Sequence, residues 1–200
     1  MSDSLPETST APSLPPEPAL NLVPGRSCDG CTMCCKMLEV VALKKPRQKW
    51  CPDCAIGKGC NIYETRPEEC RAFYCGWMVD AGIPDHWAPK HSRMVLAYNI
   101  SQNQVMVHVD ASRGDAWRQP PFITDLQNMA RHAASRGRLF LLRSGQEAWA
   151  LLPDRAKNLG TVRDDQVALM VRETTPGGVR HDVIVVEPDD PRVAQAKRSG

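Results

Sequence analysis

Nine cysteines gather in the first 75 residues of this 200-residue chain. They are Cys28, Cys31, Cys34, Cys35, Cys51, Cys54, Cys60, Cys70 and Cys75. A metal site needs several thiolate sulfurs about 2.3 Å from one ion, and a Cys-x-x-Cys turn supplies two of them from a single bend. Residues 28–31 and 51–54 both have this spacing, and Gly30 can adopt the positive φ that such a bend often requires. All nine cysteines are therefore candidate metal ligands.

Other uses of the thiols fit the pattern less well. A single Cys-x-x-Cys would also suit a thioredoxin-like redox pair, but here two of them occur with five more thiols inside 48 residues. A disulfide scaffold would leave one thiol over, because nine is an odd number. The N-terminus lacks the basic start and apolar stretch of a secretory signal, which predicts a cytoplasmic protein in a reducing compartment. Metal or cluster ligation is therefore favoured over disulfides and over inert buried cysteines.

Geometry limits how the thiols can be grouped. Neighbours such as Cys34 and Cys35 diverge by about 100° in a helix and about 180° in a strand, so one of them is expected to serve a different site or to be spare. Cys70 and Cys75 would lie about 140° apart on an uninterrupted helix, so either the helix ends between them or they serve different sites. Two four-sulfur sites with one spare thiol, and a single site with the other thiols free, both remain open.

The identity of the metal also remains open. An all-sulfur tetrahedral zinc site has no free coordination position, so its thiolates would be structural or storage ligands and no catalytic residue is predicted. Three cysteines spaced as Cys28, Cys31 and Cys34, with one remote ligand, would equally suit a [4Fe–4S] cluster in an electron carrier or an enzyme. In a third interpretation, a metal only shapes a surface that binds a partner. Zinc, iron or an iron–sulfur cluster is therefore the expected cofactor.

Charged and aromatic residues surround the cysteines. Four cations could offset the sulfur charge or form an exposed loop: Lys44, Lys45, Arg47 and Lys49. Four aromatic residues are expected to pack around the site: Tyr63, Phe73, Tyr74 and Trp77. Arg66 and Arg71 could donate hydrogen bonds to thiolate sulfur or face water.

The stretch "CDGCTMCC" followed by "GCNIYETRPEECRAFYCGW" resembles the YkgJ-type cysteine-cluster family, whose signature is Cys-x-x-Cys-x-x-Cys-Cys. The matching positions are Cys28, Cys31, Cys34, Cys35, Cys60, Ile62, Tyr63, Arg66, Pro67, Cys70, Phe73 and Cys75. The resemblance covers about a quarter of the chain. It implies a zinc- or iron-chelating domain in a bacterial cytosolic protein, and it assigns no role to Cys51, Cys54 or the residues from Trp87 onward.

The elements that position these residues are predicted from patterns. Residues 37–43 are predicted to form a short strand. The sequence from Thr65 to Glu68 resembles a capping box, which predicts the start of a helix that carries Cys70. Apolar residues at helical spacing predict a helix over 123–134, which Gly137 ends. Three hairpins are expected in 93–110, 138–152 and 166–188, the last turning at 176–178.

These patterns predict an α+β fold: a small, irregular, metal-stapled cysteine module and a mainly antiparallel sheet with one clear helix. The expected units are a disordered proline-rich tail (1–25), the chelating domain (26–83), an α+β domain of unassigned role (88–188) and a flexible C-terminal tail (189–200). The formal charge of +2 leaves too little excess for a polyanion-binding surface, so nucleic acid is not an expected partner. No apolar run is long enough to span a membrane, and a metal ion is the predicted partner.

Overall fold

The computed structural model describes residues 21–175 and 178–198 as an α+β fold. Residues 1–20 of the predicted tail (1–25) and residues 176–177 of the predicted hairpin turn (176–178) lie outside the described residues. The helices are α1 (Met33–Met37), α2 (Glu68–Arg71), α3 (Gly76–Val79), α4 (Pro89–Ser92), α5 (Phe122–Ser135) and α6 (Pro191–Arg198). The strands are β1 (Cys54–Ala55), β2 (Gly59–Cys60), β3 (Met94–Asn99), β4 (Gln104–Val109), β5 (Leu139–Ser144), β6 (Glu147–Leu151), β7 (Ala156–Thr161), β8 (Val167–Thr175) and β9 (Gly178–Val186).

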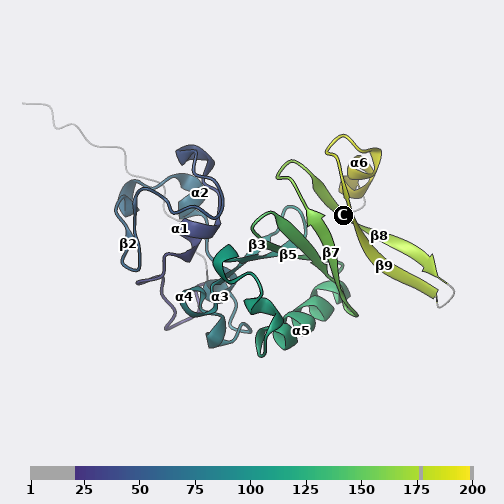
Figure 1. The fold of residues 1–200 in the computed structure, drawn as a ribbon, viewed down its shortest axis with the longest axis horizontal. Coiled ribbons are helices and arrows are strands. Elements are labelled where there is room, and N and C mark those ends of the chain that lie inside the picture. The colour runs from purple at the N-terminus through teal and green to yellow at the C-terminus, as the bar shows by residue number, and fades with distance from the viewer. Residues whose placement is uncertain (1–20, 176–177, 199–200) are drawn as a thin grey trace, which may run out of the picture.

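A five-stranded sheet in the order β3-β4-β5-β6-β7 forms the centre of the molecule (Figure 1). All its pairings are antiparallel except β4 with β5, which run parallel and are connected through α5. The expected hairpins β3–β4, β5–β6 and β8–β9 are all present. However, β8 and β9 form a separate two-stranded sheet, and β7 is a strand that the sequence patterns did not predict.

Alternation along the strands gives the sheet two different faces. Val105, Val107 and Val109 on β4 point into the main core, which α5 covers with Leu126 and Ala130. Residues of the opposite parity on β5 and β6, together with Val183 of β9, form a second cluster. On that same face, Val95 of β3 packs against Met33 and Met37 of α1. Although both clusters lie on this face, the cysteine region and the β8–β9 hairpin lie at opposite ends of the molecule (Figure 1).

Two local predictions in the cysteine region were wrong. Residues 37–43 form no strand: α1 ends at Met37, Val40 and Lys45 pair as an isolated bridge, and a 3-10 turn occupies Val41–Leu43. The tight Val40–Lys45 turn leaves Val41 71% exposed, so the apolar residues of 37–43 do not form a buried strand. The capping box is also absent, because Thr65 belongs to a preceding 3-10 turn and Pro67 takes the N-cap position without a side-chain hydrogen bond.

Within the predicted C-terminal tail (189–200), residues 191–198 form the helix α6. The Asp190 carboxylate accepts a hydrogen bond of 2.9 Å from the Arg192 backbone N–H, and Val193 is buried. An acidic N-cap followed by proline at the first helical position is a favourable start for a helix.

The division at residues 83–88 stays a prediction, but the apolar core crosses it. Ile83 and Trp87 belong to the main core beneath the sheet. Gly76 lies so close to β3 that a Cβ atom there would come within 2.4 Å of Leu96 Cδ2. Gln48 also bridges the two regions, donating 2.9 Å to the Val109 carbonyl and accepting from the Ala111 N–H at 3.1 Å.

A buried ion cluster joins α1 to the end of β4. Asp110, whose side chain is 0% exposed, accepts from Lys36 at 2.6 Å and from Arg93 at 2.7 Å. Burial alone would raise the pKa of Asp110, but hydrogen bonds from Lys36 and Ser112 lower it to about 2. The helix that carries Cys34 and Cys35 is therefore fixed to the sheet by charge as well as by Met33 and Met37.

Candidate metal centre

Two Cys-x-x-Cys turns are formed as expected. The Cys31 N–H donates to the Cys28 carbonyl at 2.9 Å, and the Cys54 N–H donates to the Cys51 carbonyl at 3.1 Å. Gly30 has φ +67°, a conformation that costs glycine little. All nine cysteines are free thiols, so no disulfide competes with metal ligation.

One set of thiols gathers near α1, and we call it the six-thiol group. It consists of Cys34, Cys35, Cys51, Cys54, Cys60 and Cys70. Cys54 and Cys60 are direct partners in the β1–β2 ladder, and the Cys51 N–H donates to the Cys35 carbonyl at 3.0 Å. Cys70 lies on α2, a single helical turn that ends at Arg71. The helix therefore ends between Cys70 and Cys75, which was one of the two alternatives that their spacing left open.

The side chains of the six-thiol group influence one another directly. A hydrogen bond with the adjacent Cys34, together with burial, raises the pKa of Cys35, while a hydrogen bond with Cys54 opposes the rise. Burial and the neighbouring Cys35 raise the pKa of Cys54 to about 11. The pKa of Cys70 is raised by burial and by the adjacent Glu69, with further contributions from Cys35, Cys51 and Cys60. Cys34 and Cys35 thus belong to the same group, although the helical spacing predicted that they would diverge.

Lys45 brings a positive charge into the six-thiol group. The residue is 3% exposed, and its ammonium donates to the carbonyl oxygens of Lys36, at 3.1 Å, and Leu38. Burial lowers the pKa of Lys45, and Cys35, Cys51, Cys34 and Cys70 oppose this effect. Among the described residues no carboxylate lies within ion-pair distance of the ammonium. The exposed-loop alternative holds for Lys44 and Lys49, whereas Lys45 is buried close to the thiols.

The other three cysteines, Cys28, Cys31 and Cys75, form a second set, which we call the three-thiol group. They line one small hollow together with Ser27, Trp77 and Lys90. Cys75 precedes α3, and burial raises its pKa while the backbone N–H groups of Met78 and Trp77 oppose the rise. The Trp77 indole Nε1 is buried and has no hydrogen-bond partner.

The remaining sequence candidates have other partners. The guanidinium of Arg66 donates to the Tyr63 carbonyl at 2.6 Å, and that of Arg71 donates to the Glu64 carbonyl at 2.7 Å. Phe73 packs against the Met33–Met37–Val95 cluster, as expected for a residue beside the site. The sequence did not identify Lys45 as the buried cation or Trp77 as an unpaired donor, because neither property has a signature in residue type or spacing.

No three Cys, His, Asp or Glu side chains in the described ranges are already arranged to hold a metal ion. The thiols are grouped but have not converged to ligand distances, so binding would require their sulfurs to move together. The chemistry of the groups is nevertheless selective, because clustered thiolates favour zinc, copper(I) and iron–sulfur centres over hard cations.

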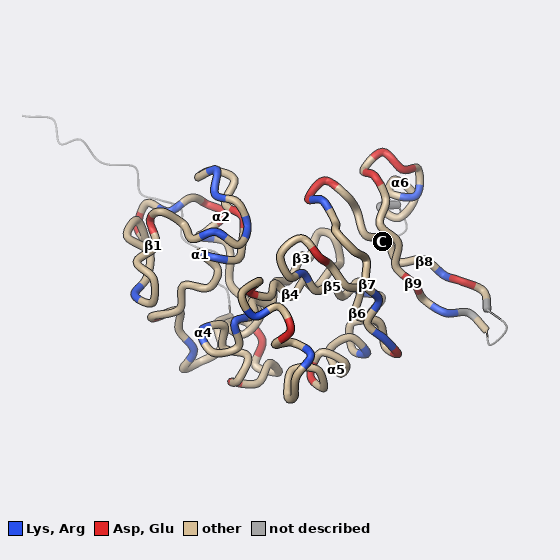
Figure 2. Tube along the Cα trace, in the orientation of Figure 1, with Lys and Arg blue, Asp and Glu red and all other residues tan. Residues whose placement is uncertain are grey.

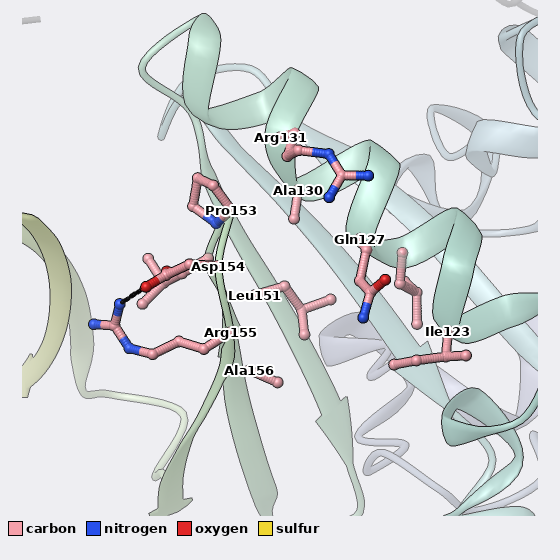
Figure 3. Close-up of a pocket in the computed structure, with 11 residues that line it drawn as sticks. Ile123, Gln127, Ala130, Arg131, Leu151, Pro153, Asp154, Arg155 and Ala156 are labelled. Atoms are coloured by element: carbon pink, nitrogen blue, oxygen red, sulfur yellow. Dashed lines mark hydrogen bonds and ion pairs between the residues drawn. The ribbon is translucent and has the colours of Figure 1, made fainter.

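A larger hollow of about 190 Å³ lies between α5 and the β6–β7 connection, remote from the cysteines (Figure 3). One of the two arginines in its lining, Arg155, is already paired with Asp154 at 2.9 Å and with Asp182 at 3.0 Å. The lining therefore offers an anionic ligand little unpaired positive charge from Arg155.

Comparisons with family models, curated proteins and solved structures found no match for this chain. Within the described residues, no helix has the length and apolar character needed to cross a membrane. Positive and negative residues are interspersed along the elements in Figure 2.

Proposed function

We propose that this chain is a cytoplasmic metal-binding protein that holds zinc or iron through clustered cysteine thiolates. The observation that carries the proposal is the six-thiol group around the buried Lys45 ammonium. A buried cation is costly unless an opposite charge accompanies it. Thiolates that ligate a metal would supply that negative charge. The resemblance of the Cys28–Cys75 motif to the YkgJ-type family supports the same proposal.

Charge balance indicates how Lys45 would act. Four thiolates around one divalent ion carry a net charge of −2, because four negative sulfurs outweigh the two positive charges of the ion. The Lys45 ammonium would halve that excess from within the protein. Residues that support ligands in this way commonly contribute about 10–100-fold to metal affinity.

An iron–sulfur cluster is the second candidate. The Cys28, Cys31 and Cys34 spacing favours it, since three cysteines two residues apart with one remote ligand suit a [4Fe–4S] cluster. The structure places Cys34 with Cys35 rather than with Cys28 and Cys31, so this ligand set would need a larger rearrangement.

Purification without oxygen, followed by elemental analysis, tests the proposal and separates the candidates. Bound zinc gives a colourless protein, whereas an iron–sulfur cluster gives a brown one with sulfide and a broad visible absorption band. Protein that contains neither metal, and that takes up neither on reconstitution under reducing conditions, would contradict the proposal.

Substitution of Lys45 tests the charge argument. Lys45→Met should lower metal affinity by about 10–100-fold, while Lys45→Arg should retain most of it. Lys44→Met is the matched control, because Lys44 is the exposed neighbour. Circular dichroism of each variant shows whether the sheet remains folded. Equal affinities for the Lys45→Met and Lys44→Met proteins would remove the charge argument.

A further inference from the structure

The hollow beside Cys75 has features of a binding site. Cys28, Cys31 and Cys75 line it, and its free volume is about 20 Å³. A volume of this size accommodates about one water-sized species, such as a single metal ion, and a further ligand would approach it from solvent. Ser27 and Lys90 also line this hollow, so a positively charged residue lies close to the three thiols.

The Trp77 indole supplies a second, independent observation. Its Nε1–H is buried without an acceptor, although Trp77 lines the hollow that contains the three thiols. A buried N–H without a partner costs about 1–3 kcal/mol and calls for an explanation. A metal-bound thiolate sulfur in the hollow would provide the missing acceptor.

Arg26 holds this indole in place. Its guanidinium lies 5.0 Å from the centroid of the Trp77 ring and donates to the Trp77 carbonyl at 2.6 Å and the Ile83 carbonyl at 2.7 Å. The N–H donor is therefore attached to a fixed ring rather than to a mobile surface side chain.

We propose that Cys28, Cys31 and Cys75 form a metal site of their own, with three thiolate ligands and a fourth position open to a small ligand from solvent. This inference rests on the proposed metal-binding function and divides that function between two sites. Closed four-sulfur zinc sites are structural, whereas sites with three protein ligands retain an exchangeable position. The three-thiol group is therefore the exchangeable site, and Trp77 Nε1 donates to one of its sulfurs.

Charge and protons balance without a redox step. Binding of a divalent ion releases three protons from the three thiols to solvent and leaves a site with a net charge of −1. A free thiol that enters the fourth position loses one further proton and brings its sulfur as a thiolate. The positive charge of Lys90 beside the hollow would face this added negative charge.

Metal counting on the full chain tests the division. Apo-protein, reduced with a phosphine instead of a thiol, is titrated anaerobically with Zn²⁺ or Co²⁺. Cys28→Ser and Cys75→Ser should each remove about one equivalent of metal relative to the wild type and leave the remaining ion in place. Cys54→Ser and Cys60→Ser should instead perturb that remaining ion. Loss of all metal, or of none, from the Cys28→Ser and Cys75→Ser proteins would overturn the separate site.

Addition of 2-mercaptoethanol tests the open position. The Co²⁺ spectrum of the wild type should change as the added thiol enters the fourth position, and that of the Cys28→Ser protein should not. A wild-type spectrum that does not respond would refute the open position. Failure of the wild type to bind any metal would instead refute the proposed function, so the two failures are distinguishable.

The role of the indole has a matched control. Trp117 also has a buried Nε1 without a partner, but it lies in the main core. Trp77→Phe should shift the sulfur-to-cobalt charge-transfer band and weaken Co²⁺ binding at the three-thiol group about 10-fold or more. Trp117→Phe should leave both unchanged. Identical band positions and affinities in the two variants would contradict the N–H···S assignment.

Discussion

The cysteine region and the sheet region of this chain are stabilised in different ways. The sheet region has six-residue strands and the fourteen-residue α5, and these bury one continuous apolar core. The cysteine region has helices of four or five residues and strands of two, and turns rather than regular elements place its thiols. Structures with so little core usually depend on metal or disulfides. The comparison shows that the sheet region can fold through apolar burial, and it predicts that the cysteine region depends on bound ligands.

Metal removal should separate the two regions most strongly. In the metal-loaded protein, complete chelation should abolish amide-exchange protection in residues 28–77, because ligand bonds there replace an apolar core. Structural zinc contributes about 10–16 kcal/mol of apparent binding free energy in small domains. Protection in β4 and β5 should remain. Hydrogen exchange read by mass spectrometry measures both, and unchanged protection in 28–77 would show that the cysteine region folds without metal.

Asp110→Asn tests the buried ion cluster that joins the two regions. It removes a buried carboxylate from Lys36 and Arg93, and breaking such a pair costs up to about 3–5 kcal/mol. Chemical denaturation at neutral pH measures the loss. Asp115→Asn serves as the control, because its carboxylate is exposed. A difference of less than about 1 kcal/mol between the two variants would mean that the ion cluster does not join the regions energetically.

Leu142→Ala tests the sheet region alone. Leu142 is fully buried in the main core, and truncation of such a residue costs about 2–5 kcal/mol. The loss should be the same with and without chelator, since no cysteine contributes to this core. Ile100→Ala is the control, because Ile100 lies in the β3–β4 turn and is 87% exposed. A chelator-dependent loss in Leu142→Ala would show that the two regions unfold as one unit.

His108 should make stability depend on pH. Burial, with contributions from Arg47 and Arg143, lowers its pKa from 6.5 to about 3. Below pH 6.5, His108 binds a proton in the unfolded chain but stays neutral in the folded chain. The free energy of unfolding therefore falls by up to about 1.4 kcal/mol per pH unit until the folded-state pKa is reached. Denaturant midpoints between pH 7 and pH 4 should therefore vary less in the His108→Gln protein than in the wild type. Equal pH dependence would contradict this account.

The smallest expected effect concerns Arg47. It links the cysteine region to the β7–β8 connection through ion pairs with Glu39, at 3.5 Å, and with Asp164. Arg47 is partly buried but both of its partners are exposed, so Arg47→Ala should cost no more than about 1 kcal/mol in a denaturation experiment. A much larger cost would mean that the β7–β8 connection is part of the cysteine region's support.

Sequence patterns predicted the sheet region better than the cysteine region. Apolar patterns in 94–109 predicted β3 and β4, and helical spacing in 123–134 predicted α5. Both β4 and α5 bury one face, whereas β3 is a continuous apolar run that is buried on both faces at its start. The edge strand β7 was missed, since its residues are mostly exposed and show no apolar alternation. The start of α6 could have been predicted from Asp190 and Pro191, which are the N-cap and the first helical residue. The polar composition of this segment suggested a tail instead.

The candidate ligands were identifiable from spacing, but their grouping was not. Cys75 lies beside Cys28 and Cys31 because the chain returns to them after α2, a long-range contact that no local pattern encodes. Lys44 and Lys45 look equivalent in sequence, yet the left-handed conformation of Lys44 turns the chain so that only Lys45 is buried. The YkgJ-type resemblance and the metal itself stay predictions.

The positions of the five tryptophans give the protein a built-in optical readout. Trp87, Trp117 and Trp149 belong to the main core, whereas Trp77 lines the three-thiol group and Trp50 precedes Cys51. A quenching ion such as Co²⁺ would reduce the fluorescence of Trp77 and Trp50 first and leave the emission of the core tryptophans largely unchanged. Intrinsic fluorescence could therefore follow occupancy of the cysteine region in real time, without a label, while the emission maximum of the core reports that the sheet is still folded.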